Sequence, residues 1–216
     1  ADMGLAVSLS VHMLSQLCIL SSGTDEQKER FLPQMTAGRE LGAFALTEPQ
    51  AGSDAAALSL TATRDGEDYL LSGTKIWITN AGEAARYIVF GTVDRSAGKS
   101  GITAFVVEAD TPGFRLGSKE RKMGIRGTTG YELVFEDARV PAAHRLGEEG
   151  DGLRVALSAL GSGRIGIGAC CVGLARSAME LAARYALQRR QFGRAIADQE
   201  MIQGMLAAMG VRLGPV

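Results

Sequence analysis

Residues 60–71 read LTATRDGEDYLL, two short stretches on either side of the turn Asp65-Gly66-Glu67-Asp68. Side chains of a β-strand point alternately to its two faces, so the period of two in these stretches predicts strands. The glycine in the short connection predicts that the two strands form a hairpin. The hairpin places a β-domain in the middle of the chain.

The same alternation recurs on both sides of the hairpin. Further strand-like runs, separated by glycine-rich or charged turns, are IWIT (76–79), YIVFGT (87–92), ITAFVV (102–107) and YELVF (131–135). Many short strands with such turns are typical of an antiparallel barrel or sandwich. We expect this β-domain to span residues 41–148.

Helical patterns flank the β-domain. In residues 1–22 one broad apolar face is predicted, made of Leu5, Leu9, Val11, Met13, Leu17 and Leu20. Thr24 and Gln27 form a capping box for a second helix, which is expected to bury Phe31 and Met35 and to end near Gly38.

After Pro141 the pattern returns to helix, is broken at Gln188-Arg189-Arg190-Gln191-Phe192-Gly193, and resumes with Asp198 as the expected cap. The predicted fold class is α+β. It has the end of a helical domain at 1–40, the β-domain, and the beginning of a helical bundle at 149–216.

Composition excludes several classes. The 216 residues are 46% hydrophobic and 22% charged with a net charge of -1, which is ordinary globular composition. The sequence has no basic patch with interleaved aromatics, so nucleic-acid binding is not predicted. It also has no apolar run that indicates a membrane span or a signal peptide. Cys18, Cys170 and Cys171 lack metal spacing and are expected to be buried in a reduced compartment. No metal site is predicted.

The glycine-rich stretch Gly161-Ser162-Gly163-Arg164-Ile165-Gly166 matches the dinucleotide fingerprint G-x-G-x-x-G. That motif requires a preceding strand and a following βαβ unit. Here the preceding residues 153–160 favour helix, so close helix packing or ligand approach is the preferred interpretation.

Three stretches are poorly explained by packing: LTEPQAGSD (46–54), KIWITN (75–80) and RRQFG (189–193). Pro49 and Gly52 make the first a loop rich in small hydrogen-bonding side chains. Trp77, the sole tryptophan, either fills the β-core or stacks on a planar heterocycle beside Thr79. The pair Arg189-Arg190 either complements a helix dipole or binds a phosphate.

These stretches, in order along the chain, resemble the acyl-CoA dehydrogenase family. The resemblance extends through GTDEQKERFLPQM (23–35), VEADTPGFRLG (107–117), KMGIRGTTGYELVFEDARVP (122–141) and GRIGIGACCVGLARSAMELAARYALQRRQFGRAI (163–196). It implies FAD as cofactor, an acyl-CoA substrate, a homotetramer with FAD sites shared between subunits, and an electron-transferring flavoprotein as electron acceptor. Short- or branched-chain members are the most similar.

The resemblance also implies the site residues. Those expected to contact FAD are Phe44, Leu46, Thr47, Gly52, Ser53, Trp77, Ile78, Thr79, Arg189, Arg190, Gln191, Phe192 and Gln199. Trp77 would pack on the flavin and Thr79 would bond near its N5, while the segment from Arg189 would reach the FAD of a neighbouring subunit. Ser53 and Arg164 are expected to contact the substrate.

In the family reaction a carboxylate removes the α-proton and the β-hydrogen leaves as hydride to flavin N5, giving a trans-2-enoyl-CoA. The resemblance places the base beyond Val216, or in a minority of members at a position that is Gly163 here. Both ends look cut, and Gly163 cannot act as a base, so we expect the 216-residue stretch to be inactive by itself. An acyl-CoA oxidase-like enzyme and a non-catalytic flavin- or CoA-binding module remain alternatives. The expected location is the bacterial cytoplasm, or the mitochondrial matrix in a eukaryote.

Overall fold

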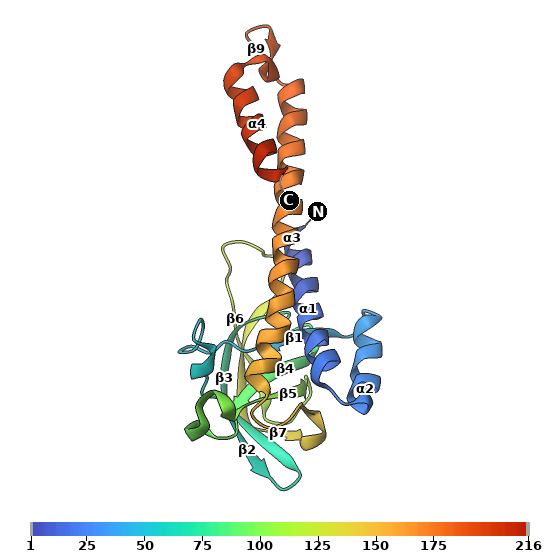
Figure 1. Ribbon diagram of the computed structural model, residues 1–216, viewed down its shortest axis with the longest axis vertical. Coiled ribbons are helices and arrows are strands. Elements are labelled where there is room, and N and C mark those ends of the chain that lie inside the picture. Colours follow the sequence, from blue (N-terminus) through green and yellow to red (C-terminus); the bar gives the residue numbers. More distant parts are fainter. Residues whose placement is uncertain (1, 215–216) are drawn as a thin grey trace. The chain divides into compact units, whose positions relative to one another are not determined.

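A computed structural model describes residues 2–214 (Figure 1). The chain divides into two compact units: the larger unit is Gly4–Arg164, and the smaller unit is built mainly from the segment that starts at Ile165. The larger unit holds α1, α2, the main sheet and the first turns of α3. The smaller unit holds the rest of α3, a short hairpin and α4.

One sheet organises the larger unit. Its strands are β1 (Leu41–Ala45), β2 (Thr61–Asp65), β3 (Asp68–Thr79), β4 (Ala84–Thr92), β5 (Ile102–Glu108), β6 (Phe114–Lys119), β7 (Gly130–Pro141) and β8 (Arg145–Leu146). They lie in the order β6-β7-β3-β2-β4-β5-β8, with β1 beside β4. The pairings are antiparallel except that β1 and β2 run parallel to β4, which the sequence pattern did not predict.

The hairpin at residues 61–72 is confirmed. β2 pairs with β3 from Thr61 opposite Ser72 to Asp65 opposite Asp68. Gly66 in the two-residue connection has a φ of 63°, a left-handed conformation that glycine adopts without steric cost.

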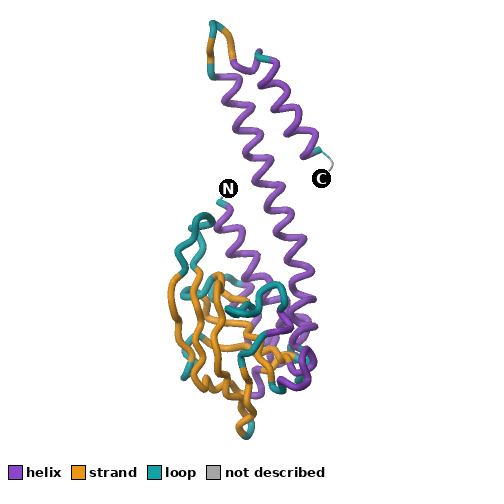
Figure 2. Tube along the Cα trace, turned by 90° about the vertical axis from the view of Figure 1, so that its left-hand side faces the viewer, coloured by secondary structure: helices purple, strands orange, loops and turns teal. Residues whose placement is uncertain are grey.

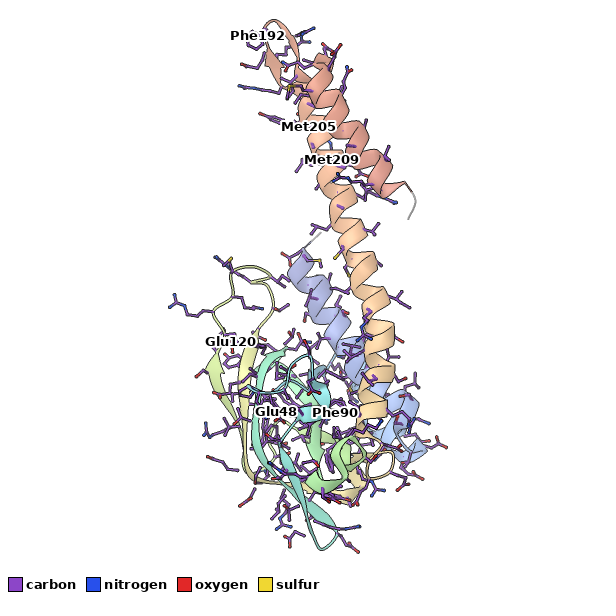
Figure 3. All side chains as sticks on the ribbon, turned by 60° about the vertical axis from the view of Figure 1, so that its left-hand side comes forward. Glu48, Phe90, Glu120, Phe192, Met205 and Met209 are labelled. Atoms are coloured by element: carbon purple, nitrogen blue, oxygen red, sulfur yellow. The ribbon has the colours of Figure 1, made fainter. Side chains whose placement is uncertain are left out.

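Two apolar clusters lie on opposite faces of the sheet because the side chains of β4 and β5 alternate. Ile88 and Phe90 belong to the cluster that α1, α2 and the start of α3 cover. Val89 and Phe105 belong to the cluster enclosed by β2, β3 and β7. Figure 2 shows the strands of this unit with helical segments along one side, and Figure 3 labels Phe90. Each fully buried side chain of this size contributes roughly 1.5–3 kcal/mol.

The helical segments begin and end close to the predicted positions. α1 spans Met3–Ser22, α2 spans Asp25–Thr36 and the capping box of Thr24 and Gln27 is present. Short 3-10 turns cover Ala55–Ala57, Arg95–Gly101 and Ala142–His144. Phe31 and Met35 of α2 are fully buried, as predicted.

The predicted apolar face of α1 is wrong. Leu5, Leu9, Met13 and Leu20 are 41–60% exposed. The side chains that α1 buries are instead those of His12, Leu14, Ser15, Cys18 and Ile19. Apolar residues surround much of this helix, so periodicity could not select a face. Contacts select it: the Gly42 amide donates to Nδ1 of His12 at 3.0 Å.

Among the described residues, α1 and α3 are long and apolar enough to cross a membrane. Core helices of soluble proteins pass the same test of length and composition. α1 packs its polar side chains inward within the larger unit. Nε2 of His12 lies 3.0 Å from the Met35 carbonyl, and the Ser15 hydroxyl donates to the His12 carbonyl at 2.7 Å. These contacts identify α1 as a helix packed against protein.

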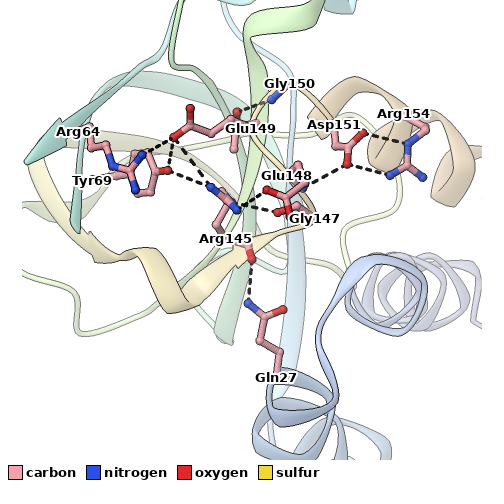
Figure 4. A network of polar contacts seen from close by, with 11 residues as sticks. Gln27, Arg64, Tyr69, Arg145, Gly147, Glu148, Glu149, Gly150, Asp151 and Arg154 are labelled. Carbon is pink, nitrogen blue, oxygen red and sulfur yellow. Dashed lines mark hydrogen bonds and ion pairs between the residues drawn. The ribbon is translucent and has the colours of Figure 1, made fainter. Parts of the chain in front are cut away.

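A polar network joins α2 to the segment that leads into α3 (Figure 4). Arg145 of β8 forms an ion pair of 2.7 Å with Glu148, and the Tyr69 hydroxyl donates to Glu149. Gln27 donates its side-chain amide to the Arg145 carbonyl at 2.8 Å. The network fixes the start of α3 on the sheet.

In the smaller unit α3 (Gly152–Gln188) is followed by β9 (Arg190–Gln191), β10 (Arg194–Ala195), a 3-10 turn (Ile196–Asp198) and α4 (Glu200–Leu213). The prediction that Asp198 caps α4 is wrong: the N-cap is Gln199, without a side-chain cap bond, because Asp198 lies inside the 3-10 turn. Against expectation, Cys170 is only half-buried and Cys171 is exposed. Cys18 is buried, which raises the pKa of its thiol to about 12. Figure 3 labels Met205 and Met209 on α4, both exposed.

Candidate functional site

Trp77 stands out at the end of β3. Its side chain is 65% exposed, which excludes the interpretation that it fills the core. Its φ is 59°, within a register shift between Lys75 and Ile78. A bulky residue in this left-handed region is uncommon and costs about 1–2 kcal/mol. Such strain at an exposed aromatic is typical of a functional site.

A cavity of about 400 Å³ lies beside the Trp77 ring. Its lining is Trp77, Thr79, Glu120, Arg121, Lys122 and Gly130. Trp77 and Thr79 therefore share one cavity, while Ile78 between them is buried in the core. Lys122 donates to the Thr128 carbonyl at 2.7 Å. Partial burial, together with the charge of Lys119, lowers the pKa of Lys122. The cavity thus joins an aromatic plane to hydroxyl and cationic groups.

The LTEPQAGSD loop follows β1 directly. Phe44 of β1 packs against Phe90 with ring centroids 5.0 Å apart, and Leu46 is buried. Thr47 is half-buried, and Gly52 and Ser53 are exposed. A Cβ added at Gly52 would meet nothing within 4 Å, so the space next to the Gly52 backbone is open.

Backbone and side-chain contacts join this loop to β3. The Ile76 amide donates to the Thr47 carbonyl at 3.0 Å. Nζ of Lys75 donates to the Leu46 carbonyl at 3.0 Å and forms an ion pair of 2.7 Å with Glu48. These contacts therefore hold residues 46–48 of the loop against the part of β3 that directly precedes Trp77.

The Lys75–Glu48 pair is buried. Desolvation, only partly offset by the charge of Glu48, lowers the pKa of Lys75 to about 8. Burial alone would raise the pKa of Glu48, but the charge and hydrogen bond of Lys75 and the amides of Leu60 and Ser59 hold it below its ordinary value. Desolvation therefore determines the direction of the Lys75 shift, whereas the partner charge and the hydrogen bonds determine that of Glu48.

Asn80 anchors the other side of the bulge. Its φ is 69°, and its side-chain amide donates to the carbonyls of Ser8 at 2.9 Å and Gly42 at 3.1 Å. The Ser8 hydroxyl donates back to Oδ1 of Asn80 at 2.7 Å. The strained segment is thus tied to α1 and β1.

The RRQFG residues form a hairpin in the smaller unit. Gln191 pairs with Arg194, and the two turn residues Phe192 and Gly193 have φ values of 53° and 79°. Positive φ at both positions is typical of a type I′ turn. Phe192 is 94% exposed, and Arg189, Arg190 and Gln191 are exposed beside it. The half-buried Gln199 follows in the same unit.

The glycine-rich stretch lies inside α3, which excludes a dinucleotide-binding turn. A Cβ added at Gly163 would lie 2.7 Å from Cδ2 of Leu14, so this glycine permits close packing of α3 on α1. Arg164 next to it is exposed. A cavity of about 620 Å³, lined in part by Lys99 and Arg154, lies over the first turns of α3.

Three family models match the chain in order. They describe the acyl-CoA dehydrogenase N-terminal domain over residues 1–39, the middle domain over residues 43–138 and the C-terminal domain over residues 150–214. The chain belongs to the acyl-CoA dehydrogenase family.

Similar proteins agree with this assignment. An acyl-CoA dehydrogenase of Bacillus subtilis (strain 168) is 49% identical over 207 residues, which cover 95% of this chain and 55% of that protein. The solved butyryl-CoA dehydrogenase from Megasphaera elsdenii has a TM-score of 0.97 at 45% identity, covering 99% of this chain and 56% of that one. A solved acyl-CoA dehydrogenase complexed with FAD from Bacillus anthracis has a TM-score of 0.92 at 39% identity, covering 97% and 36%.

The resemblance inferred from the sequence and the α+β fold class of the acyl-CoA dehydrogenase family are confirmed. The chain spans about half the length of the curated relatives that it matches. Among described residues 2–214, no group of three or more His, Cys, Asp or Glu side chains is arranged to hold a metal ion.

Sequence reasoning missed the roles of Lys75 and Glu48 and of the charged residues around Trp77. Glu48 and Lys75 were visible as an acid and a lysine in two unusual stretches, but nothing in the spacing indicated that they meet. Lys99 and Arg154 were missed because they lie far apart in the sequence and share only a cavity.

Proposed function

We propose that the protein is an FAD-dependent acyl-CoA dehydrogenase that oxidises a short acyl-CoA thioester to the trans-2-enoyl-CoA. The observation that carries this proposal is Trp77, a mostly exposed aromatic in a strained conformation above a cavity of about 400 Å³. Likeness to a butyryl-CoA dehydrogenase supports the short acyl chain.

The residues present fit FAD. An exposed indole plane suits an isoalloxazine, and the Thr79 hydroxyl on the same cavity suits its polar edge. The open space before Gly52 leaves room for a ligand to approach the backbone. Likeness to an acyl-CoA dehydrogenase complexed with FAD supports this assignment.

Each group has a defined task in the proposal. Trp77 orients the ring by stacking, and Thr47 and Thr79 bond its edge. Phe44, Leu46 and Ile78 anchor these residues in the two apolar clusters of the sheet. When bound, FAD supplies the acceptor for the hydride that leaves the β-carbon. A dry, oriented site matters because the α-proton is weakly acidic and the developing enolate needs hydrogen bonds at the thioester oxygen.

The acyl-CoA is proposed to bind along α3. Arg164 is exposed on this helix, and the cavity beside Lys99 and Arg154 provides cationic groups. Guanidinium and ammonium groups suit the phosphates of a CoA. Ser53, exposed on the loop, is proposed to lie where cofactor and substrate meet.

The exposed RRQFG hairpin is proposed to reach the FAD of a neighbouring subunit in a homotetramer, with Arg189, Arg190, Gln191, Phe192 and Gln199 as contacts. An exposed Phe192 in a left-handed turn supports an intermolecular role. We further propose domain limits of 1–40, 41–148 and 149–216, an electron-transferring flavoprotein as acceptor, and a location in the bacterial cytoplasm or, in a eukaryote, the mitochondrial matrix.

The test is an anaerobic titration of the native holoprotein with butyryl-CoA, followed by the visible absorption of its flavin. Bleaching with formation of the enoyl-CoA is the expected result. Rapid reoxidation by air after bleaching would indicate an oxidase instead. Binding of butyryl-CoA to a flavin that stays oxidised would overturn the enzymatic proposal in favour of a binding module.

A further inference from the structure

The buried ion pair of Lys75 and Glu48 calls for an explanation beyond stability. The two side chains are 0% and 1% exposed, and Nζ lies 2.7 Å from Oε1. Replacing a buried ion pair by apolar groups of similar volume is often neutral or stabilising. A pair of this kind is therefore weak evidence for stability, and its specific geometry must be considered.

The geometry links two segments. Lys75 also donates to the Leu46 carbonyl at 3.0 Å, and Glu48 accepts from the amides of Leu60 at 3.0 Å and Ser59 at 2.7 Å. The carboxylate is thus fixed by the backbone at the entrance to β2. The Lys75 ammonium is fixed in turn by the Glu48 carboxylate, and it donates to the carbonyl of Leu46, the residue before Thr47.

The same two residues border the candidate site. Glu48 directly follows Thr47, and Lys75 precedes Trp77 by two residues. Between them the Ile76 amide donates to the Thr47 carbonyl at 3.0 Å. Neither charged group reaches the surface, so neither can contact a bound ligand, but both determine where Thr47 lies relative to Trp77.

We propose that Lys75 and Glu48 are positioning residues that hold Leu46 and Thr47 against the bulged end of β3 and thereby set the FAD-binding surface around Trp77. This inference rests on the proposed function for its ligand. Asn80 fixes the far side of the bulge through Ser8 and Gly42. Loss of the ion pair therefore loosens both the Leu46–Thr47 backbone and the Lys75–Trp77 segment that bonds it, while Asn80 stays attached.

Two variants of the full chain separate positioning from stability. Lys75→Met leaves the Glu48 charge buried without its partner and is expected to destabilise the fold. Glu48→Gln/Lys75→Met removes both charges and is expected to recover part of that stability, because glutamine has one oxygen where the two carboxylate oxygens accept the amides of Leu60 and Ser59 separately. The matched control is Arg86→Met, which breaks the Arg86–Glu40 ion pair of 3.1 Å. The two side chains of this pair are 19% and 25% exposed, and they contact neither the loop nor Trp77.

The first readout needs no cofactor. Trp77 is the sole tryptophan, so the anisotropy of tryptophan fluorescence reports its mobility in the apo chain. Lower anisotropy in both pair variants, at temperatures where each is folded, is expected, with no change in Arg86→Met. Wild-type anisotropy in the double variant would overturn the proposal.

The second readout is the FAD dissociation constant. Ordering two freed backbone residues on binding predicts about 30-fold weaker FAD binding in the double variant, equivalent to ~2 kcal/mol. Recovery of stability together with wild-type FAD affinity would show a purely structural pair and refute positioning. A wild-type chain that binds no FAD would contradict the proposed function, while the anisotropy readout would still decide the positioning role.

Discussion

Trp77→Ala is expected to weaken FAD binding about 30-fold. The side chain is 65% exposed. A tryptophan offers up to about 250 Å² of surface, so roughly 160 Å² is free and a ligand stacked on one face would cover about 80 Å². At about 25 cal/mol per Å² this corresponds to ~2 kcal/mol, or about 30-fold in Kd. Trp77→Phe keeps a smaller ring and should show an intermediate loss.

The assay is a titration of FAD into each purified variant, followed by flavin fluorescence. Leu20→Ala is the matched control, because Leu20 is also exposed (56%) but lies on α1 and lines no part of the Trp77 cavity. Thermal unfolding of each variant shows whether the fold is intact. A Kd for Trp77→Ala within about threefold of wild type, or roughly 0.6 kcal/mol, would refute stacking on this ring.

Two further predictions concern stability. Thr24→Ala removes the hydroxyl that accepts from the backbone amide of Gln27, and it should lower the free energy of unfolding, measured in urea, by about 1 kcal/mol. Thr24→Ser keeps the hydroxyl and should cause no such loss. Equal losses in the two variants would contradict the capping role. Glu48 has a folded-state pKa below its ordinary 4.5, so its contribution is present above that value and is lost as the pH falls through the folded pKa. The melting temperature of Glu48→Gln should therefore fall less on acidification than that of wild type, and parallel declines would contradict this linkage.

Several features were predictable because they depend on neighbours in the sequence. The capping box of Thr24 needs only a residue three positions away, and the hairpin around Gly66 needs only alternation and a short turn. The break after Gln188 was likewise visible as a local change of pattern. The ordered set of motifs between residues 23 and 196 indicated the family, which the comparisons confirm.

The predictions that were wrong concern contacts between distant segments. The buried face of α1 is decided by His12 at Gly42 and by Leu14 at Gly163, partners that are 30 or more residues away. Asp198 was a reasonable cap by residue type, but the preceding 3-10 turn moved the helix start by one residue.

The sequence by itself determined where most helices and strands form, because local hydrogen bonding and the alternation of apolar residues act over a few positions. It also determined the family, through short motifs whose order is preserved. Only the tertiary structure decided that Trp77 is exposed in a strained bulge and that Lys75, two residues before it, meets Glu48. The physical reason is that burial and charge pairing depend on distances in space, and these are set when the sheet brings residues 46–51 and 75–80 together.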